Sequence, residues 1–207
     1  MVCTNDNRYG ERKMEEKMTR SYRLAEKFSQ LFDLESKIDT VLSASLYYLN
    51  QFMDSERSSI FIFQPWNQKL TIFSSLDLEK HEVSIPKSCG VAGRVFVDRQ
   101  PAVVNHAYAD NRFYREVDEM TGFKTRNLVC TPLLDPRDHC LGTLQSLNKN
   151  GGDFSADDLE LLNLAARMMA VAINNSRQYN ELVVTNEARR KLLRKLTESS
   201  SNIFDKA

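Results

Sequence analysis

Residues 58–63 read Ser-Ser-Ile-Phe-Ile-Phe. From Ile60 onward both alternating sets of side chains are apolar, which is typical of a β-strand that is covered on its two faces. The strand is expected to end at a turn that contains Pro65, Trp66 and Asn67. This short stretch therefore predicts a sheet that carries helices on both sides.

Further short segments on both sides of this stretch have the composition of strands. They are residues 70–73, 82–85, 102–105, 128–134 and 140–147. The last two flank Asp135-Pro136-Arg137-Asp138, which is a favourable hairpin turn. Pro86 is expected to stop the strand before it, and the two glycines within residues 90–96 predict a turn that leads into a short helix.

Helical spacing of apolar residues precedes and follows the strands. We expect a disordered segment over residues 1–13, a charged helix over 14–35 and an amphipathic helix that starts near residue 38. After the strands, Ser155 is a candidate N-cap for a long helix. The order of helix, antiparallel strands and helix predicts an α+β fold.

The end of that last helix carries a spacing that resembles a coiled-coil seam. The seam positions are Leu182, Asn186, Arg189, Leu193 and Leu196. They alternate in steps of four and three residues over barely two heptads. Residues 179–207 therefore form either a dimerising coiled coil or a single solvated helix.

Composition excludes several classes of protein. The 28 basic and 28 acidic side chains give a formal net charge of zero, which disfavours a broad nucleic-acid-binding face. No apolar run reaches membrane-spanning length, and the first residues lack the apolar core of a signal peptide. We therefore expect a cytoplasmic protein that binds neither nucleic acid nor membrane.

The cysteines and histidines give no metal-binding pattern. They are Cys3, Cys89, Cys130, Cys140, His81, His106 and His139. The cysteines contain no CxxC pair, so a zinc site or disulfide framework is not expected. Two of them, Cys130 and Cys140, fit small buried strand positions. Each histidine stands alone in polar sequence and is expected at the surface.

A polar stretch interrupts the apolar rhythm between two predicted strands. Residues 105–126 read NHAYADNRFYREVDEMTGFKTR. A polar connection of this length inside a compact domain is usually a functional lid or a disordered insert. This stretch is therefore the first candidate for a binding element.

The motifs in and around this stretch resemble a known family, the GAF domain. They are GVAGRV at 90–95, AYADNRF at 107–113, EVD at 116–118 and TGFKTR at 121–126. Residues 127–133 and 141–149 continue the resemblance, which covers about residues 38–180. It is greatest to the regulatory GAF domains of cyclic-nucleotide phosphodiesterases and of related bacterial adenylyl cyclases.

The resemblance implies an architecture for the whole chain. It is a GAF/PAS-like central antiparallel sheet with helices on both faces, flanked by N- and C-terminal dimerisation helices. The GAF domain is expected over residues 36–178, with a signalling helix or coiled coil over residues 179–207.

The resemblance also implies a nucleotide pocket. Its candidate ligand-binding residues are Ser59, Phe73, Ser74, Ala92, Asp118, Thr121, Thr125 and Gln145. Phe73 would stack on the purine, Ser59 would bond to the base, and the backbone of Ala92 would lie near the phosphate. Asp118, with the two threonines, would close a lid, and Gln145 would face the pocket from a central strand.

Each of these residues has a plainer alternative role. Phe73 can be part of the core, and Ser59 can serve close strand packing. Asp118 can cap its own loop, Thr121 can belong to an ordinary turn, and Gln145 can face solvent at a sheet edge. Only their joint position on one family pocket favours binding.

A second family signature consists of Asn-Lys, a Phe, three further residues and Asp-Glu. Asn148, Lys149, Phe154 and Asp158 match it, and Leu159 stands where the family has Glu. The resemblance implies a structural ion pair between Lys149 and Asp158. The departure at Leu159 removes no expected ligand contact.

The resulting functional hypothesis is a non-catalytic sensor without a resident cofactor. It would bind cyclic AMP or cyclic GMP and relay occupancy through flanking helices of a homodimer to an output domain, in cis or in trans. The alternative is a GAF dimerisation or protein-interaction module that binds no nucleotide. A methionine sulfoxide reductase or a bilin photosensor is disfavoured, because only Cys89 lies near the expected pocket.

Overall fold

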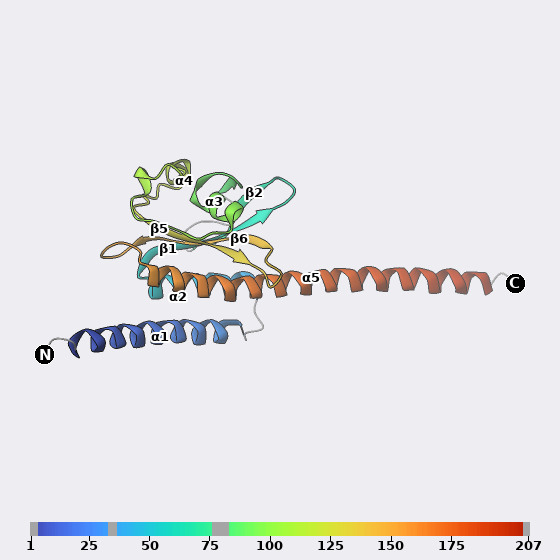
Figure 1. Cartoon of the computed structure of the whole chain (residues 1–207). Helices are drawn as coiled ribbons and strands as arrows, with labels where there is room; N and C mark the ends of the chain where they lie inside the picture. Colours follow the sequence, from blue (N-terminus) through green and yellow to red (C-terminus); the bar gives the residue numbers. More distant parts are fainter. Residues whose placement is uncertain (1–3, 33–36, 76–82, 205–207) are drawn as a thin grey trace. The chain divides into compact units, whose positions relative to one another are not determined.

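The computed structural model describes residues 4–32, 37–75 and 83–204 of the chain (Figure 1). It contains two compact units, Met1–Val171 and Ala172–Ala207. The first unit holds the sheet and the helices that cover it, and its architecture determines where a ligand could bind.

A six-stranded antiparallel sheet forms the centre of the first unit, in the order β3-β2-β1-β6-β5-β4. The strands are β1 Ser55–Gln64, β2 Lys69–Ser75, β3 Ser84–Pro86, β4 Ala102–Val104, β5 Leu128–Leu134 and β6 Cys140–Lys149. The sequence predicted all six. Pro86 ends β3, an edge strand, where its missing N–H costs no interior ladder bond.

Helices cover both faces of this sheet (Figure 1). On one side lie α2 (Ile38–Met53) and the start of α5 (Ala156–Phe204); on the other lie α3 (Gly90–Asp98) and α4 (Glu116–Thr121). Within β1, Ile60, Phe61 and Ile62 are all buried, as the apolar stretch predicted. The predicted α+β fold with a doubly covered sheet is confirmed.

The first helix, α1, covers Thr4–Phe32. The expected disorder of residues 1–13 is therefore wrong for residues 4–13, whose backbone is helical, and residues 1–3 lie outside the described part. This segment reads TNDNRYGERK and contains no proline. Glu11, Arg12 and Lys13 at its end favour a helix, and extending a helix that has already formed costs less than starting one, so the helix continues back over the polar residues before them. Leu24 and Phe28 are fully buried.

The last helix, α5, begins as the sequence predicted. Ser155 N donates to the Asp158 carboxylate over 2.9 Å, and Asp158 N donates to the Ser155 hydroxyl over 3.2 Å. This reciprocal pair is a capping box with Asp in place of Glu. The helix then continues without a break past residue 178 to Phe204.

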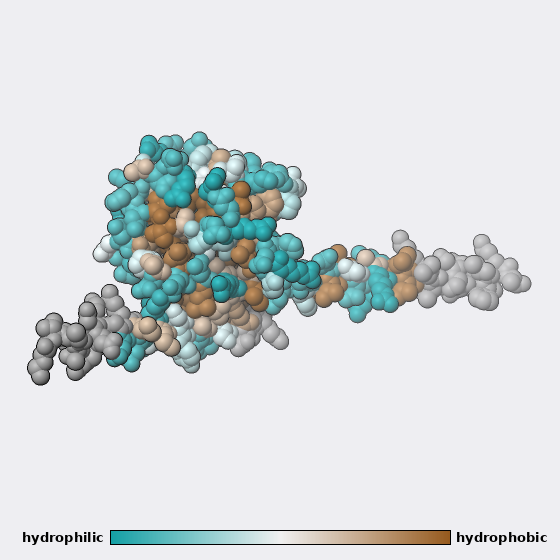
Figure 2. Space-filling view, in the orientation of Figure 1, coloured by the Kyte–Doolittle hydropathy of each residue, from teal (hydrophilic) through white to brown (hydrophobic). Residues whose placement is uncertain are grey.

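The second unit consists of the C-terminal part of α5 and carries exposed apolar side chains. Figure 2 shows brown surface among the hydrophilic residues of this helix. The exposed apolar residues here are Tyr179, Leu182, Val183, Val184, Leu192 and Leu193. The side chain of Leu196 lies outside the described part of the structure.

The remaining expectations concern cysteines, histidines and membranes. Cys130 is buried and Cys140 is partly buried. His106 and His139 are exposed, whereas Cys3 and His81 lie outside the described residues. Within those residues, none of the helices combines the length and apolar character that crossing a membrane requires.

Candidate functional site

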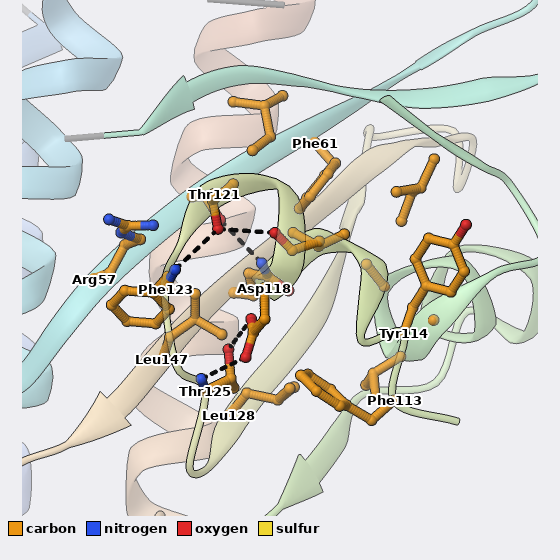
Figure 3. A pocket seen from close by; sticks show the side chains of 18 residues that line it. Arg57, Phe61, Phe113, Tyr114, Asp118, Thr121, Phe123, Thr125, Leu128 and Leu147 are labelled. Carbon is orange, nitrogen blue, oxygen red and sulfur yellow. Dashed lines mark hydrogen bonds between the residues drawn. The ribbon is translucent and has the colours of Figure 1, made fainter. Parts of the chain in front are cut away.

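A cavity lies between the sheet and the segment that contains α4 (Figure 3). Its floor comes from β1, β2, β3, β5 and β6, and the start of α3 closes one end. Of the expected binding residues, it is lined by Ser59, Ala92, Asp118, Thr121, Thr125 and Gln145. Tertiary folding thus brings together residues that lie up to 86 positions apart.

Two of the expected residues are not among those that line the cavity. In β2 it is Ile72 that lines it, and Phe73 does not. The register between β1 and β2 shifts here, because Phe61 pairs with Ile72 and the preceding Ile60 pairs with Ser74. This bulge falls at Phe73, which stands between the two pairs. The backbone of Ser74 belongs to β2, but its side chain lies outside the described part.

Other aromatic residues surround the cavity instead. They are Phe61 on β1 and Phe113, Tyr114 and Phe123 on the segment around α4. Figure 3 shows these rings around the space. They were not among the expected ligand-binding residues, although the last three lie inside the polar stretch 105–126. Alternation along β1 gave a signal for Phe61, two positions beyond Ser59.

Asp118 anchors the lid, which we define as residues 113–125. Its side chain is buried and accepts hydrogen bonds from Thr125 N over 2.6 Å and Thr125 Oγ1 over 2.7 Å. Tyr108 Oη donates a third bond over 3.0 Å. This hydrogen bond is the main reason why the pKa of Tyr108 is raised above its ordinary value. The carboxylate therefore fastens α4 to both flanks of the lid.

Thr121 ends α4. Its hydroxyl donates to the Val117 carbonyl over 2.8 Å, and Phe123 N donates to it over 3.4 Å. Gly122 follows with φ +68° and returns its N–H to the Asp118 carbonyl over 2.8 Å. A glycine in this left-handed conformation is the usual helix ending, so the Thr-Gly pair turns the lid towards β5.

The floor of the cavity carries a small polar cluster. Gln145 Nε2 donates to Ser59 Oγ over 3.0 Å from the neighbouring strand. The partly buried Gln145 thus has a hydrogen-bond partner inside the cavity. Arg57 lies two residues before Ser59 and also lines the cavity. Its guanidinium carbon is 4.1 Å from the centre of the Phe123 ring, so the lid stacks on this cation.

The N-terminus of α3 faces the other end. Gly90, Val91 and Ala92 line the cavity. The first helical bond runs from Gly93 N to the Cys89 carbonyl over 3.1 Å, so the preceding N–H groups lie outside the helical ladder. These groups and the helix dipole favour a negative charge at this end.

The cavity is compact in this arrangement. It leaves about 60 Å³ for the centres of water-sized molecules, enough for a few waters. Small-molecule sites commonly offer roughly 300–1,000 Å³. A ligand of nucleotide size therefore requires the lid to move outward.

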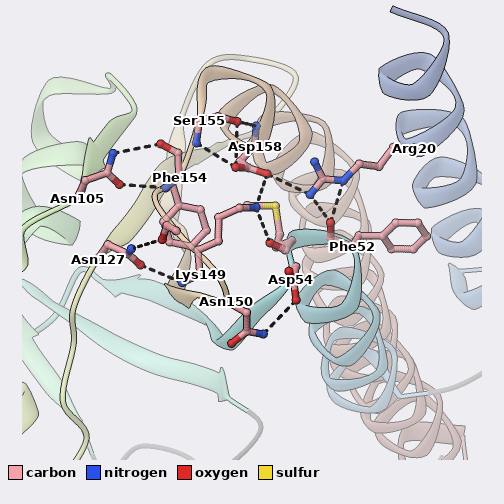
Figure 4. Close-up of polar contacts among 12 residues, drawn as sticks. Arg20, Phe52, Asp54, Asn105, Asn127, Lys149, Asn150, Phe154, Ser155 and Asp158 are labelled. Atoms are coloured by element: carbon pink, nitrogen blue, oxygen red, sulfur yellow. Dashed lines mark hydrogen bonds and ion pairs between the residues drawn. The ribbon is translucent and has the colours of Figure 1, made fainter. Parts of the chain in front are cut away.

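A separate polar network joins the second family signature to α1 (Figure 4). Lys149 Nζ lies 2.9 Å from Asp158 Oδ1, which is the ion pair that the resemblance implies. Arg20 of α1 lies 3.0 Å from the same oxygen and donates from Nε to the Phe52 carbonyl over 2.9 Å. Neither member of the ion pair lines the cavity. No pattern in the sequence indicated a role for Arg20.

The charge of Asp158 is stabilised by these contacts. Burial alone raises the pKa of this carboxyl group, but the Ser155 N–H and the Lys149 ammonium outweigh it and hold the pKa below its ordinary value. Because Asp158 is almost fully buried, removing one of its partners would leave a buried charge without compensation and destabilise the fold.

Known proteins share both the sequence pattern and the fold. The chain is 28% identical over 162 residues to dual 3',5'-cyclic-AMP and -GMP phosphodiesterase 11A of Takifugu rubripes, covering 71% of this chain and 18% of that protein. It is 26% identical over 189 residues to dual 3',5'-cyclic-AMP and -GMP phosphodiesterase 11 of Drosophila melanogaster. This match covers 82% of this chain and 13% of that protein. The chain thus spans less than a fifth of the length of these two relatives.

Solved structures give the same fold. The GAF domain of a phosphoenolpyruvate-protein phosphotransferase from Coxiella burnetii matches with a TM-score of 0.70 at 14% identity, over 79% of this chain and 98% of that one. The GAF domain of the Acinetobacter phosphoenolpyruvate-protein phosphotransferase matches with a TM-score of 0.66 at 18% identity. The match covers 80% of this chain and 98% of that one. The family model described as GAF domain matches residues 37–173. The chain therefore belongs to the GAF domain family.

Proposed function

We propose that this GAF domain is a sensor that binds a cyclic nucleotide, cyclic AMP or cyclic GMP, in the cavity under the lid. The observation that carries the proposal is the convergence of Ser59, Ala92, Asp118, Thr121, Thr125 and Gln145 on one cavity. Two relatives are named as phosphodiesterases of cyclic AMP and cyclic GMP. Their names support the ligand class.

The chemistry of the cavity suits such a ligand. A cyclic phosphate carries one negative charge, which backbone N–H groups at the start of α3 can hold. A purine is flat and needs apolar faces with a few edge contacts, which Phe61, Phe113 and Phe123 provide together with Ser59 and Gln145. The charged Asp118 would act by fastening the lid, because its oxygens already bond to Thr125 and Tyr108.

Ligand binding would act on the flanking helices through the lid and the sheet. A signal passes only if the ligand binds two arrangements of the protein with different affinity. We infer that the chain works as a cytoplasmic homodimer joined through α1 and α5. It would serve an output domain located in cis or in trans.

The alternative function is a dimerisation or protein-interaction module that binds no nucleotide. The small volume of the cavity favours this reading. The satisfied hydrogen bonds of Asp118 favour it as well, since the lid is already stable without a ligand contact.

Thermal unfolding with added ligands separates the two functions. The 207-residue chain would be heated with cyclic AMP, cyclic GMP, 5'-AMP or 5'-GMP. A ligand present at 100 times its dissociation constant stabilises the folded state by about 2.7 kcal/mol. Stabilisation by a cyclic nucleotide but not by the monophosphates supports the sensor. No stabilisation by any of the four at millimolar concentration would leave only the interaction module.

A further inference from the structure

One end of the cavity floor is polar and cationic. Arg57 pairs with Leu147 and Ser59 pairs with Gln145 across β1 and β6, and all four residues line the cavity. Among the lining residues of the described structure, Arg57 is the only Arg or Lys and Asp118 is the only acid. Arg57 is therefore the cation that this end of the cavity presents.

The polar groups here are mainly hydrogen-bond donors. Gln145 Nε2 donates to Ser59 Oγ over 3.0 Å, so the Ser59 hydroxyl keeps its own hydrogen for another acceptor. A guanidinium has five N–H donors and no acceptor. The Gln145 carbonyl oxygen is the acceptor beside them. A ligand edge with two neighbouring acceptors fits this arrangement.

The lid orients Arg57, and the neighbouring acid is paired with other residues. The Phe123 ring of the lid stacks on its guanidinium at 4.1 Å. The adjacent acid, Glu56, binds Arg126 over 2.8 Å and Asn148 over 2.7 Å. Because a guanidinium is planar, a stacked ring fixes the plane in which its donors point. Lid closure therefore aims Arg57 as well as covering the cavity.

The opposite end of the cavity suits the phosphate. Figure 3 shows Arg57 and Tyr114 on opposite sides of the space, and Gly90, next to Tyr114, begins α3. A cyclic nucleotide with its phosphate at the start of α3 would direct its base towards Arg57. The base, rather than the phosphate, then meets the donor cluster.

We propose that Arg57 reads the base and makes the site selective for cyclic GMP over cyclic AMP. This inference rests on the proposed function. Guanine presents O6 and N7, two adjacent acceptors that a guanidinium contacts bidentately, whereas adenine presents amino hydrogens in place of O6. The N1–H of guanine can in turn donate to the Gln145 carbonyl.

Calorimetric titration of the 207-residue chain tests the proposal with cyclic GMP, cyclic IMP and cyclic AMP. Cyclic IMP keeps O6 and N7 but lacks the 2-amino group. Both O6-bearing nucleotides should bind roughly tenfold or more tightly than cyclic AMP. Arg57→Met should reduce this ratio to about one, and Arg57→Lys should retain only part of it, because lysine cannot bind bidentately.

Arg126→Met is the matched control. Arg126 is a neighbouring cation that pairs with Glu56 at the surface and does not line the cavity. Its removal should leave the ratio unchanged. If Arg57→Met does not fold, the comparison between Arg57→Lys and the unmodified chain carries the test.

The outcomes separate this inference from the proposed function. An equal loss of affinity for all three nucleotides in the Arg57 variants would assign Arg57 to the phosphate or the lid, and the inference would fall while the sensor stands. If the unmodified chain bound cyclic GMP and cyclic AMP with equal affinity, the inference would also fall while the sensor function stands. Absence of binding by any cyclic nucleotide would overturn both.

Discussion

At the residue scale, Asp118 does most to hold the lid. It combines burial with three accepted hydrogen bonds. The bonds come from Tyr108 before α4 and from Thr125 after it, so a single carboxylate joins α4 to the segments on both sides of it. Hydrogen bonds to a charged group contribute more than neutral ones, roughly 1.5–3 kcal/mol.

We expect Asp118→Asn to loosen the lid. The amide that replaces one carboxylate oxygen would bring its N–H₂ towards the donors of Thr125, so unfolding free energy should fall by about 1.5–3 kcal/mol. Hydrogen exchange of the Thr125 amide should speed up at the same time. Glu119→Gln makes the same chemical change at the next, exposed position, and an equal effect there would contradict the anchoring role.

At the element scale, the pairing of β1 with β6 depends on a glycine. A Cβ atom at Gly142 would lie 1.9 Å from the Phe61 carbonyl oxygen. Backbone atoms cannot yield as a flexible side chain does. The close approach of the two strands at this point therefore admits no side chain.

Gly142→Ala should consequently destabilise the protein by more than about 3 kcal/mol, as measured by urea unfolding. Gly122→Ala offers a comparison, because its added Cβ meets nothing within 4 Å and faces only the strain of φ +68°. That strain amounts to about 1–2 kcal/mol. Similar losses for the two variants would refute the close-approach argument.

Asp158 of α5 binds Arg20 of α1 and Lys149 of β6, and its ionisation should make the stability of the protein depend on acid pH. Its pKa is lowered in the folded state, so its stabilising effect is present above the unfolded value of about 3.9 and is lost as pH falls through the folded value. Asp158→Asn should remove this part of the acid dependence and lower stability at neutral pH.

Urea unfolding across the acidic range measures the difference between the two proteins. Asp157→Asn is the control, since Asp157 is more than half exposed and pairs with Lys17. If the Asp158→Asn chain lost stability with acid as steeply as the unmodified chain, the ion pair would not be the source of the effect.

At the scale of the whole molecule, the exposed apolar residues of α5 bear on assembly. Leu182 is 61% exposed and Leu193 is 53% exposed, and both lie on the seam that the sequence predicted. Exposed leucines along one stripe of a helix can be buried by packing against the same stripe of a second copy in a coiled coil. Val184, equally exposed at 66%, lies off the seam.

The chain is therefore expected to sediment as a dimer in analytical ultracentrifugation. The double variant Leu182→Glu, Leu193→Glu should sediment as a monomer, because it brings like charges into the seam. Val184→Glu should remain dimeric. A monomeric unmodified chain, or equal sensitivity at Val184, would exclude this seam as the interface.

Features with a local cause could be predicted from the sequence. The strand Ser55–Gln64 was predicted from its continuous apolar run, the β5–β6 hairpin from its Asp-Pro turn, and α5 from the Ser155 cap. Each of these signals depends on residues close together along the chain. The polar composition of residues 4–13 indicated disorder, but this segment extends the helix formed by the residues after it, because extending a helix costs less than starting one.

The sequence by itself determined the six strands, the long helices that flank them, their order and the family. Only the tertiary structure decided which side chains meet in the cavity. A bulge between β1 and β2 leaves Phe73 out of its lining and Ile72 within it, and lid folding brings Phe123 onto Arg57. Strand register and lid position arise from contacts between distant segments, and those contacts leave no periodic trace in the sequence.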